Sequence, residues 1–536
     1  MYTDSKILES LKKVEQTRQE RFNNKDNIKR MGADEKDAIL KQYHPDYKEE
    51  SFENLKIGVN KGEKVPHELA DMLQAHSRIA NLDLDLTKPD YDVDVLVIGG
   101  GGAGASAAIE ANEAGAEVMV VTKLRMGDAN SMMAEGGIQA ADKPNDSPAI
   151  HYLDVMGGGH FANRPELVKK LVSEAPEAIA WLSNLGVEFD KDENGNMITT
   201  HGGGTSRKRM HACKDYSGAE IMRTLRDEVL NRGIKVVDFT AAIELIKDTE
   251  GKIAGAVLLN METKDILIAR AKCVVIATGG AGRMHYQGFP TSNHYGATAD
   301  GLVLGYRAGA KLLYPDTLQY HPTGAAFPEQ ILGALVTEKV RSLGAQLVNR
   351  DGVAYIHPLE TRDVNASGII RECSDRDEGV ETGNGKAVWL DTPMIEMIGG
   401  EGTILKRIPA MYRMFAKYDI DIRKVPILVY PTLHYQNGGL EISTNGMTGV
   451  KNLFVAGEAV GGIHGRNRLM GNSLLDIIVF GRNAGKESAK AAKNTVLKDL
   501  TLSHVSDYEN ELAKANIKTD LVSPKLLPNY TKQKNI

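Results

Sequence analysis

Cysteine is scarce in this sequence, with three among 536 residues. Cys213, Cys273 and Cys373 are scattered without the CxxC spacing of cluster or zinc ligands. The chain itself is therefore not expected to hold an iron–sulfur cluster, a structural zinc or another metal site. No disulfide framework is implied either, which fits a protein of a reducing compartment.

The chain also lacks an excess of basic residues and a long apolar run. Its 65 Lys and Arg residues face 71 Asp and Glu residues, for a net charge of -6, so no overall positive field attracts nucleic acid. No apolar stretch approaches the ~20 residues that span a bilayer. Residues 1–20 mix acids with bases and contain no apolar signal-peptide core. We therefore expect a soluble, cytoplasmic chain without a nucleic-acid partner or a membrane span.

The length predicts two or more domains, because a single hydrophobic core stops growing beyond about 250–300 residues. Residues 1–91 are rich in charge, with Ile7, Leu8, Leu11 and Val14 at helical spacing and a second helical stretch at 66–80. We interpret this segment as a solvated, partly helical extension. The alternative is a docking arm for another subunit.

Short apolar strands begin to alternate with Ala- and Gly-rich helical segments at Tyr91, as in a parallel α/β sheet. Residues 95–98 predict a buried strand, and Gly99, Gly101 and Gly104 form a G-x-G-x-x-G turn that opens a helix. Glycine is required there because a Cβ would keep the backbone away from phosphate groups. The pattern predicts a dinucleotide site.

The next strand, residues 117–123, lacks the acidic residue that usually binds the ribose of NAD. Thr122 and Lys123 stand in its place, which makes ordinary NAD binding less favoured. Two later segments, 273–282 and 452–462, read as further buried strands, and the second ends in Gly457-Glu458. A carboxylate at that end would accept hydrogen bonds from ribose or ribitol hydroxyls. We expect the three strand ends to meet at one ligand.

Residues 335–344, LVTEKVRSLG, place Glu338 and Arg341 three positions apart. Such a pair usually lies exposed on a helix, where it contributes about 0.2–0.5 kcal/mol. The alternative is that both residues belong to a proton path inside the protein. The pair alone does not decide between them.

Residues from about 92 to 490 carry an ordered series of strings: GGGGAGASAA, AEGGIQAA, GATADGLVLGYRAGA, LQYHPTG, LVTEKVRSLG, TRDV, HYQNGGLEI and GEAVGGIHGRNRLMGNSLLD. In these the chain resembles the flavoprotein subunits of succinate dehydrogenase and fumarate reductase, with L-aspartate oxidase as a close relative. The resemblance implies an α/β fold: a Rossmann-like FAD-binding domain in two parts, 92–313 and 433–490, with an inserted α+β capping domain at 314–432. The helical extension of residues 1–91 and a short C-terminal tail, 491–536, complete the expected organisation.

The resemblance also implies a dicarboxylate site. Arg362 of TRDV would donate the proton, with Glu338 and Arg341 replacing it from solvent, while His321, Thr337, His434 and Arg468 would grip a C4 dicarboxylate. Arg371 and Arg466 are taken as structural. The implied FAD contacts are Gly99, Gly101, Gly102, Ala103, Gly104, Thr122, Lys123, Asn130, Ser131, Gly136, Gly137, Ala277, Thr278, Gly279, Asp300, Glu458, Asn472, Ser473 and Leu474.

Two departures from the family qualify these expectations. Asn130 stands where membrane-bound succinate dehydrogenases carry the histidine that bonds to the flavin, and Glu135 replaces the following glutamine. We therefore expect non-covalent FAD, whose lower potential favours fumarate reduction. Only 46 residues follow Lys490 in place of a long helical domain. The extension of residues 1–91 would then replace that surface in meeting an iron–sulfur subunit.

The resemblance leaves several functions open. The leading one is a fumarate reductase flavoprotein subunit that interconverts fumarate and succinate and receives electrons from an iron–sulfur or other electron-transfer subunit. The alternatives are an L-aspartate oxidase, a non-catalytic flavin subunit that relays electrons, and an enzyme for a substituted succinate or an acyl thioester. The chain would work in the cytoplasm, held at the inner face of the membrane only through partner subunits.

Overall fold

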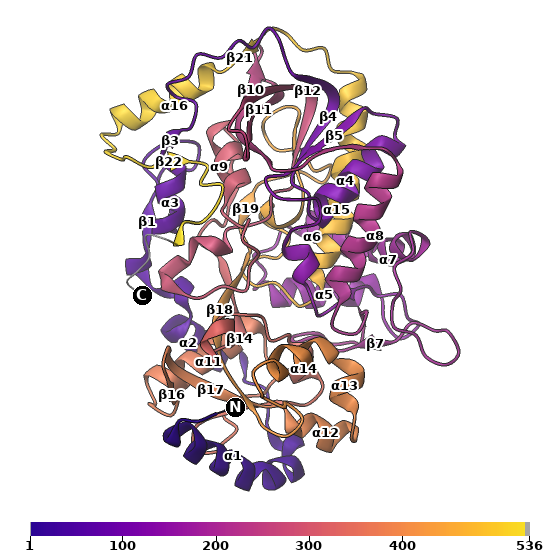
Figure 1. Ribbon diagram of the computed structural model, residues 1–536, viewed down its shortest axis with the longest axis vertical. Helices are drawn as coiled ribbons and strands as arrows, with labels where there is room; N and C mark the ends of the chain where they lie inside the picture. The colour runs from indigo at the N-terminus through magenta and orange to yellow at the C-terminus, as the bar shows by residue number, and fades with distance from the viewer. Residues whose placement is uncertain (1, 531–536) are drawn as a thin grey trace.

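The computed structural model describes residues 2–530 and has two lobes (Figure 1). The upper lobe in this view is built on an eight-stranded sheet. In spatial order its strands are β21 (Leu500–Thr501), β10 (Thr240–Asp248), β11 (Ile253–Asn260), β12 (Ile266–Ile276), β4 (Tyr91–Ile98), β5 (Val118–Val121) and β9 (Lys235–Val237), and β20 (Leu453–Val455) also pairs with β12. The neighbours β20, β12, β4, β5 and β9 run parallel. These parallel strands form the nucleotide-binding half that the sequence predicts.

Helices cover the parallel strands, which explains why the second half of strand β4, residues 95–98, is a continuous apolar run. Helix α4 (Gly102–Glu113) follows the glycine turn and packs along α15 (Asn472–Lys493). A Cβ at Gly485 would lie 2.2 Å from the carbonyl oxygen of Ala107, so the two helices approach closely only because glycine stands there. Further helices of this lobe are α5 (Pro148–Gly158), α6 (Pro165–Ser173), α7 (Ala175–Asn184), α8 (Ser217–Asn231), α9 (Asp300–Arg307) and α16 (Ser503–Lys514).

The lower lobe is built on a five-stranded antiparallel sheet. Its strands are β14 (Leu318–Ala325), β18 (Ile427–Gln436), β17 (Gly385–Asp391), β15 (Gln346–Val348) and β16 (Val380–Thr382). Its helices are α10 (Lys339–Ser342), α11 (Arg362–Ser374), α12 (Pro393–Gly399), α13 (Thr403–Arg407) and α14 (Pro409–Ala416). Together the lobes give the expected class, a Rossmann-like α/β lobe joined to an α+β lobe; the domain boundaries remain a prediction.

The N-terminal segment is part of the folded body, which corrects the expectation of a solvated extension. Helix α1 (Ser5–Asn23) crosses the outer side of the lower lobe (Figure 1), and its residues Ile7, Leu11 and Val14 are buried with Trp389 in the core of that lobe. Leu8 is 37% exposed and stays outside. Helix α2 (Ala33–Tyr43) packs on α11. The apolar stripe of this segment is therefore covered by the chain itself.

The segment then crosses to the upper lobe, where the helix expected over 66–80 proves shorter. Helix α3 (His67–Leu73) ends before Gln74, because residues His76–Ser77 form strand β3 and pair with β22 (Val522–Ser523) of the C-terminal tail. A distant strand thus overrides the local helical pattern. The smaller elements are β1 (Phe52–Asn54), β2 (Lys64–Pro66), β6 (Ile138–Gln139), β7 (Thr199–Thr200), β8 (Met210–His211), β13 (Leu312–Leu313) and β19 (Gly439–Leu440).

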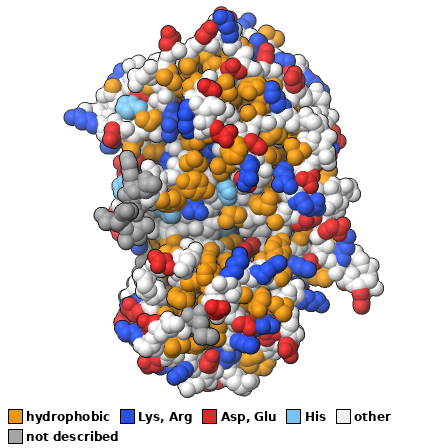
Figure 2. Space-filling view, viewed as in Figure 1, with side chains coloured by type: hydrophobic (Ala, Val, Ile, Leu, Met, Phe, Trp, Pro, Cys, Tyr) orange, Lys and Arg blue, Asp and Glu red, His pale blue; other side chains and the backbone are white. Residues whose placement is uncertain are grey.

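The surface agrees with the even charge balance. Figure 2 shows acidic and basic side chains interspersed over the face that it presents, without a field of one sign. None of the helices within residues 2–530 has the length and apolar character that a membrane crossing needs.

Candidate functional site

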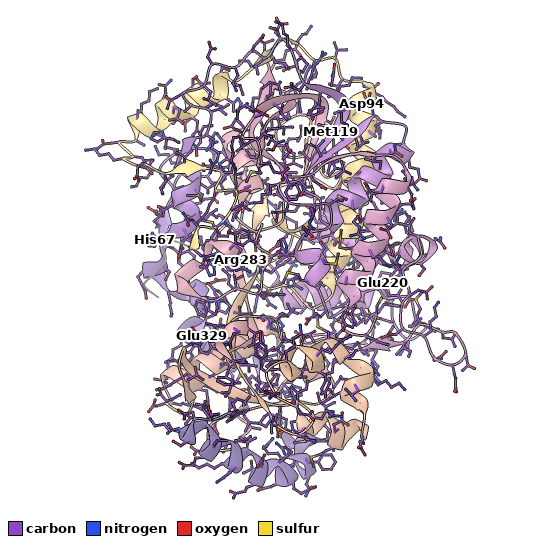
Figure 3. The ribbon with its side chains drawn as sticks, viewed as in Figure 1. His67, Asp94, Met119, Glu220, Arg283 and Glu329 are labelled. Atoms are coloured by element: carbon purple, nitrogen blue, oxygen red, sulfur yellow. The ribbon has the colours of Figure 1, made fainter. Side chains whose placement is uncertain are left out.

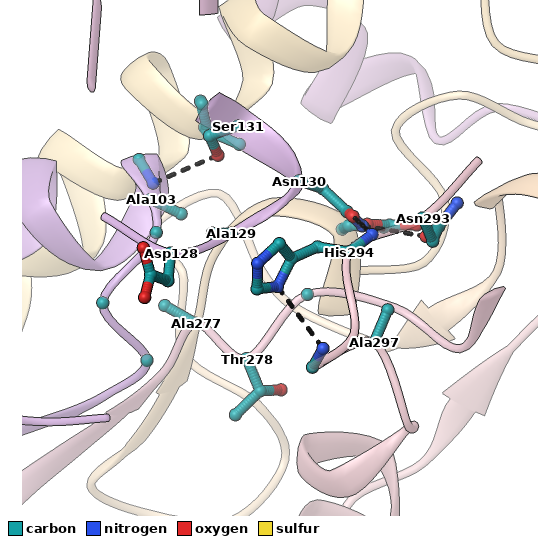
Figure 4. Close-up of a pocket in the computed structure, with 18 of the residues that line it drawn as sticks. Ala103, Asp128, Ala129, Asn130, Ser131, Ala277, Thr278, Asn293, His294 and Ala297 are labelled. Atoms are coloured by element: carbon teal, nitrogen blue, oxygen red, sulfur yellow. Dashed lines mark hydrogen bonds between the residues drawn. The ribbon is translucent and has the colours of Figure 1, made fainter. Parts of the chain in front are cut away.

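A large cavity opens where the three predicted strands end side by side (Figure 4). Residues 99–103 after β4, residues 277–279 after β12 and Glu458 after β20 all line it; Figure 4 labels Ala103, Ala277 and Thr278 among them. The cavity contains about 1330 Å³ of empty space, part of it open to solvent, and reaches His434 and Arg468 at the junction of the lobes. The strand ends therefore converge as the sequence predicts.

The glycine turn fits a closely approaching backbone. Gly99 has a φ of +121°, and a Cβ there would lie 2.2 Å from the carbonyl oxygen of Ala277. A Cβ on Gly104 would lie 1.9 Å from the carbonyl oxygen of Gly99, so helix α4 could not start against the strand. The amide of Gly102, at the start of α4, donates to the hydroxyl oxygen of Ser131 at 3.1 Å. A helix N-terminus is thus presented to the cavity, which favours an anionic group there.

A buried chain of charged side chains lies at the junction of the lobes. Glu338 Oε2 accepts hydrogen bonds from Arg362 Nε at 2.9 Å and from Arg341 Nη2 at 3.3 Å. Arg362 Nη1 also donates to Gln319 Oε1 at 3.0 Å, and Gly203 N donates to Glu338 Oε1 at 2.5 Å. Glu338 and Arg341 are each 1% exposed. The exposed-pair alternative for these two residues is wrong.

The pKa values in this chain follow from burial and close charges. Burial raises the pKa of the Glu338 carboxyl, but Arg362 and Arg341 outweigh it, and the net pKa is lowered. Burial lowers the pKa of Arg341 to about 10 despite Glu338 beside it. Burial, followed by the charge of Arg362, lowers the pKa of Arg468 to about 9. These two guanidinium groups lose a proton more readily than arginine in water.

Two histidines face each other beside this chain. His321 on β14 and His434 on β18 have ring centroids 5.1 Å apart. Burial, then nearby arginines, lower both pKa values well below the usual one, so both rings are neutral. Thr323 N donates to His321 Nδ1 at 3.2 Å, which leaves the hydrogen on Nε2. That buried Nε2 has no hydrogen-bond partner among residues 2–530, an arrangement that points to a missing ligand.

Arg468 and Thr337 complete the set predicted for a dicarboxylate. The Arg468 guanidinium lies 4.3 Å from the ring centroid of Tyr435, and its buried Nε also has no partner in the part of the chain that the structure describes. Thr337, which directly precedes Glu338, is 2% exposed. The predicted group is thus assembled from both sides of the junction.

The charges in this group do not cancel. Arg341, Arg362 and Arg468 each carry one positive charge, and Glu338 supplies one negative charge in direct contact. The site therefore buries an excess of two positive charges. Removing these charges from water costs free energy unless a bound anion compensates them. A small dianion would balance the site.

Comparison with known proteins now adds a family. Residues 94–474 match the FAD binding domain family. This chain belongs to that family. Over 398 residues it is 38% identical to a subunit of the CoM/CoB fumarate reductase of Methanothermobacter marburgensis, covering 72% of this chain and 71% of that one. It is 34% identical over 397 residues to the L-aspartate oxidase of Streptomyces coelicolor, covering 72% and 66%.

A solved structure of E. coli quinol fumarate reductase has the same fold. It matches with a TM-score of 0.72 and 29% identity, covering 79% of this chain and 74% of that one. The protein is therefore an FAD-dependent flavoprotein oxidoreductase of the family that includes fumarate reductase and succinate dehydrogenase flavoprotein subunits and L-aspartate oxidases.

The cavity of this FAD-binding protein fits the cofactor on its own observations. Glu458 accepts from Gln436 N at 3.0 Å and from Asn130 Nδ2 at 3.2 Å, and burial raises the pKa of its carboxyl. Thr278 Oγ1 is buried without a partner among residues 2–530. A ligand with hydroxyl donors and acceptors would satisfy both groups.

Lys123 is held in place rather than free. Its ammonium pairs with Asp300 and donates to Thr298 Oγ1 at 2.7 Å and to the carbonyl oxygen of Leu526 at 2.6 Å. Lys123 and Asp300 both line the cavity. The C-terminal tail, through Leu526, thus supports this end of the FAD site.

Most of the predicted FAD contacts line the cavity, and four do not. Gly104, Gly136, Gly137 and Asn472 are not among its lining residues; Asn472 Oδ1 instead lies 3.1 Å from His151 Nε2. The others are on the wall: Gly99, Gly101, Gly102, Ala103, Thr122, Lys123, Asn130, Ser131, Ala277, Thr278, Gly279, Asp300, Glu458, Ser473 and Leu474.

Sequence reasoning missed several side chains at this site. His294 and Asn293 line the cavity beside Asn130 (Figure 4), where Asn130 Nδ2 donates to Asn293 Oδ1 at 2.8 Å. Gln319, which binds Arg362, could have been found, because it lies two residues before His321 on the same face of β14. Gly203 reaches Glu338 from a distant loop, and no local pattern indicates that contact.

Proposed function

We propose that this protein interconverts fumarate and succinate as the catalytic flavoprotein subunit of a fumarate reductase. The supporting observation is the buried chain of Arg362, Glu338 and Arg341, which Gln319 connects to Arg468 on the lining of the FAD cavity. Together the three arginines and Glu338 leave two uncompensated positive charges. A C4 dicarboxylate brings two negative charges and would balance them. The similarity to a component of a fumarate reductase supports the same function.

Arg362 is the proton donor in this proposal. When bound in its reduced form, FAD would supply a hydride for one alkene carbon, and the other carbon must then receive a proton. Arg362 delivers that proton, and Glu338, hydrogen-bonded to Arg362 Nε, returns one from Arg341. Free arginine is a poor acid, but its fixed charge also stabilises the developing negative charge in a site closed to water. The proton lost is replaced at once, so no neutral guanidinium accumulates.

In this proposal the substrate is bound by neutral hydrogen-bond donors and by one cationic side chain. His321 presents Nε2–H, His434 and Thr337 add further donors, and Arg468 supplies a charge that stacking on Tyr435 keeps oriented. Neutral histidines donate hydrogen bonds without adding to the positive charge already present. Orientation therefore comes from the histidines and affinity mainly from the arginines.

L-aspartate oxidase is the second candidate, because a relative with that name is 34% identical. Aspartate adds an ammonium group to the two carboxylates and so carries one net negative charge. Glu338 is the acid in contact with the arginines, and its oxygens are taken by Arg362, Arg341 and Gly203. An added ammonium would lack a partner, which favours fumarate.

The electrons reach the flavin from another subunit in this proposal. Among residues 2–530 there is no group of three or more His, Cys, Asp or Glu side chains that could hold a metal ion, so an iron–sulfur or other electron-transfer subunit supplies them. FAD is bound without a covalent link, since the amide of Asn130 offers no nucleophilic nitrogen. The chain works in the cytoplasm, at the inner face of the membrane through its partners.

Flavin spectroscopy on the purified protein tests the proposal. Under anaerobic conditions, dye-reduced flavin should be reoxidised by fumarate, and oxidised flavin should not be bleached by aspartate. Fumarate turnover should proceed with reduced dyes and fail with NADH alone. Bleaching by aspartate without reoxidation by fumarate would replace the proposal with the oxidase. No response to either substrate would leave only an electron-relay subunit or a different acceptor.

A further inference from the structure

Carboxylates hold the segment that carries Arg362 on both sides. Glu360, two residues earlier, pairs with Lys36 at 2.9 Å. Asp363, the next residue, pairs with His160 Nε2 at 2.6 Å. Lys36 is on α2, which packs on α11 and belongs with the lower lobe. His160 follows α5 of the upper lobe. Its contact with Asp363 therefore joins the FAD-binding lobe directly to the first turn of α11.

The backbone at His160 is shaped for this contact. His160 has a φ of 57° and Phe161 a φ of 56°, a left-handed conformation that non-glycine residues adopt only at a cost. Burial of the Phe161 side chain does not offset this free-energy cost, because that side chain is 73% exposed. Gly159 anchors the turn by accepting from Arg466 N at 3.1 Å. The strained turn aims the imidazole of His160 at Asp363.

The charged groups around His160 favour its protonated form. The hydrogen bond to Asp363 raises the pKa of His160 above its usual value, against the effect of burial, while Arg466 lowers it and Asp37 of α2 raises it. Arg466 is itself paired with Asp316 at 2.7 Å.

Two further groups near this pair contribute little charge. Burial lowers the pKa of His44, at the end of α2, to about 4, so that ring is neutral. Burial also raises the pKa of Asp46 well above its usual value. The ion pair of His160 and Asp363 is therefore the main titrating contact at this point between the lobes.

We propose that His160 is a positioning residue: its protonated ring fastens the FAD-binding lobe to Asp363 and so holds the first turn of α11, with Arg362, against the cavity. The inference rests on the proposed role of Arg362 as proton donor. His160 does not touch the reacting atoms; it acts through Asp363. The effect should be on kcat more than on KM, since the groups that bind the substrate lie on β14, on β18, before α10 and before α15, and none of them is on α11.

The sign of the pH dependence follows from the pair. Below the raised pKa of His160 the ion pair is intact. As the pH rises through that value, the charge on the ring is lost, the contact becomes a hydrogen bond from a neutral ring, and the first turn of α11 is held less firmly. Turnover should therefore fall on the alkaline side.

Hydrogen exchange tests the positioning without relying on activity. The FAD-loaded wild type, His160→Gln and His67→Gln are compared at the same near-neutral pH. His67 is the matched control: it is a half-exposed histidine 3.7 Å from the carboxylate of Glu53, at the outer edge of the upper lobe (Figure 3). Amides of residues 362–366 should exchange at least roughly tenfold faster in His160→Gln only, a change of about 1.4 kcal/mol in local opening. Equal rates in the two variants overturn the proposal.

Kinetics with reduced dye and fumarate give the second test. His160→Gln should lower kcat by roughly tenfold or more, as misplacement of a catalytic group does, with KM within about twofold and the alkaline fall of kcat abolished. His67→Gln should keep the wild-type profile. An alkaline fall that persists unchanged in His160→Gln overturns the proposal. If the wild type does not reduce fumarate, the proposed function fails, and the exchange experiment still decides whether His160 holds α11.

Discussion

Two Glu–Arg pairs with the same spacing in the sequence differ in burial. Glu338 and Arg341 are three positions apart, as are Glu220 and Arg223, and both pairs are hydrogen-bonded. The first pair is 1% exposed, whereas Arg223 is about half exposed on the outside of α8. Burial and contact with Arg362, not spacing, distinguish the first pair from the surface ion pair on α8.

The contrast gives a matched test of the proton path. Glu338→Gln removes the carboxylate that links Arg362 with Arg341 and should lower fumarate turnover by about 10²–10⁴-fold, the range of general acid–base catalysis. FAD should stay bound at the wild-type ratio, measured by absorbance. The control is Glu220→Gln, in the exposed pair on α8; Figure 3 labels Glu220. This variant should leave turnover within about twofold. Wild-type turnover in Glu338→Gln would contradict the path.

Buried neutral histidines predict acid sensitivity. Burial lowers the pKa of His44 and of His151 from 6.5 to about 4, so the unfolded chain binds protons there at a pH where the folded protein does not. Stability should therefore fall as the pH drops from about 6.5 towards 4, by up to about 1.4 kcal/mol per unit for each such histidine.

Urea unfolding at a series of pH values measures that slope. His151→Gln keeps a donor for Asn472 Oδ1, which His151 Nε2 approaches at 3.1 Å, but cannot be protonated. The slope should become shallower in this variant. An unchanged slope would contradict the assignment of His151 as one of the groups responsible.

At the scale of elements, α1 is joined to the lower lobe by a buried ion cluster as well as by apolar packing. Asp391 at the end of β17 pairs with Arg18 at 2.9 Å and with Arg21 at 2.8 Å, and its side chain is fully buried. Trp389 Nε1 donates to Ser10 Oγ at 2.8 Å in the same interface. The sequence predicts the helix and its apolar stripe, but the partner surface lies some 370 residues away in the chain.

Breaking this cluster should destabilise the lower lobe. Arg21→Ala leaves Asp391 buried with one partner fewer and should cost about 3–5 kcal/mol, as removal of one member of a buried pair does. Lys13→Ala breaks the pair of the same helix with Asp351, in which both side chains are over 40% exposed, and should cost less than about 1 kcal/mol. Similar shifts in the urea midpoint for both variants would show that the buried cluster does not anchor α1.

At the scale of the whole molecule, segments from both ends of the chain support the cofactor site from outside its lining. Residues 44–80 return from the lower lobe to the upper one, and the C-terminal tail pairs β22 with β3 and then reaches Lys123, Thr298 and Asp300 through Leu526. Further along the tail, Tyr295 Oη donates to the carbonyl oxygen of Pro528 at 2.9 Å. The tail thus contacts and supports residues that line the FAD cavity.

Truncation after Leu521 should weaken retention of FAD. Loss of Leu526 removes one acceptor from Lys123 and one donor from Asp300. Dissociation of FAD, followed by the rise of its fluorescence, should then be roughly tenfold faster, equivalent to about 1.4 kcal/mol. Val496→Ser, a substitution at a residue 74% exposed near the start of the same tail, serves as the control and should release FAD at the wild-type rate. Equal rates for truncated and control proteins would contradict a role of the tail.

The sequence by itself determined the strand and glycine turn of the FAD-binding lobe. It also determined which charged residues are candidates for the site. Residues 95–98 had to form a buried strand, and Gly99 and Gly104 had to be glycine, because these constraints are local. Tertiary structure alone decided that α1 is covered, that the helix after Pro66 stops at Leu73, and that Gly203 reaches Glu338. The reason is physical: hydrogen bonding and turn geometry act between near neighbours, whereas burial and the field of other charges depend on residues hundreds of positions apart.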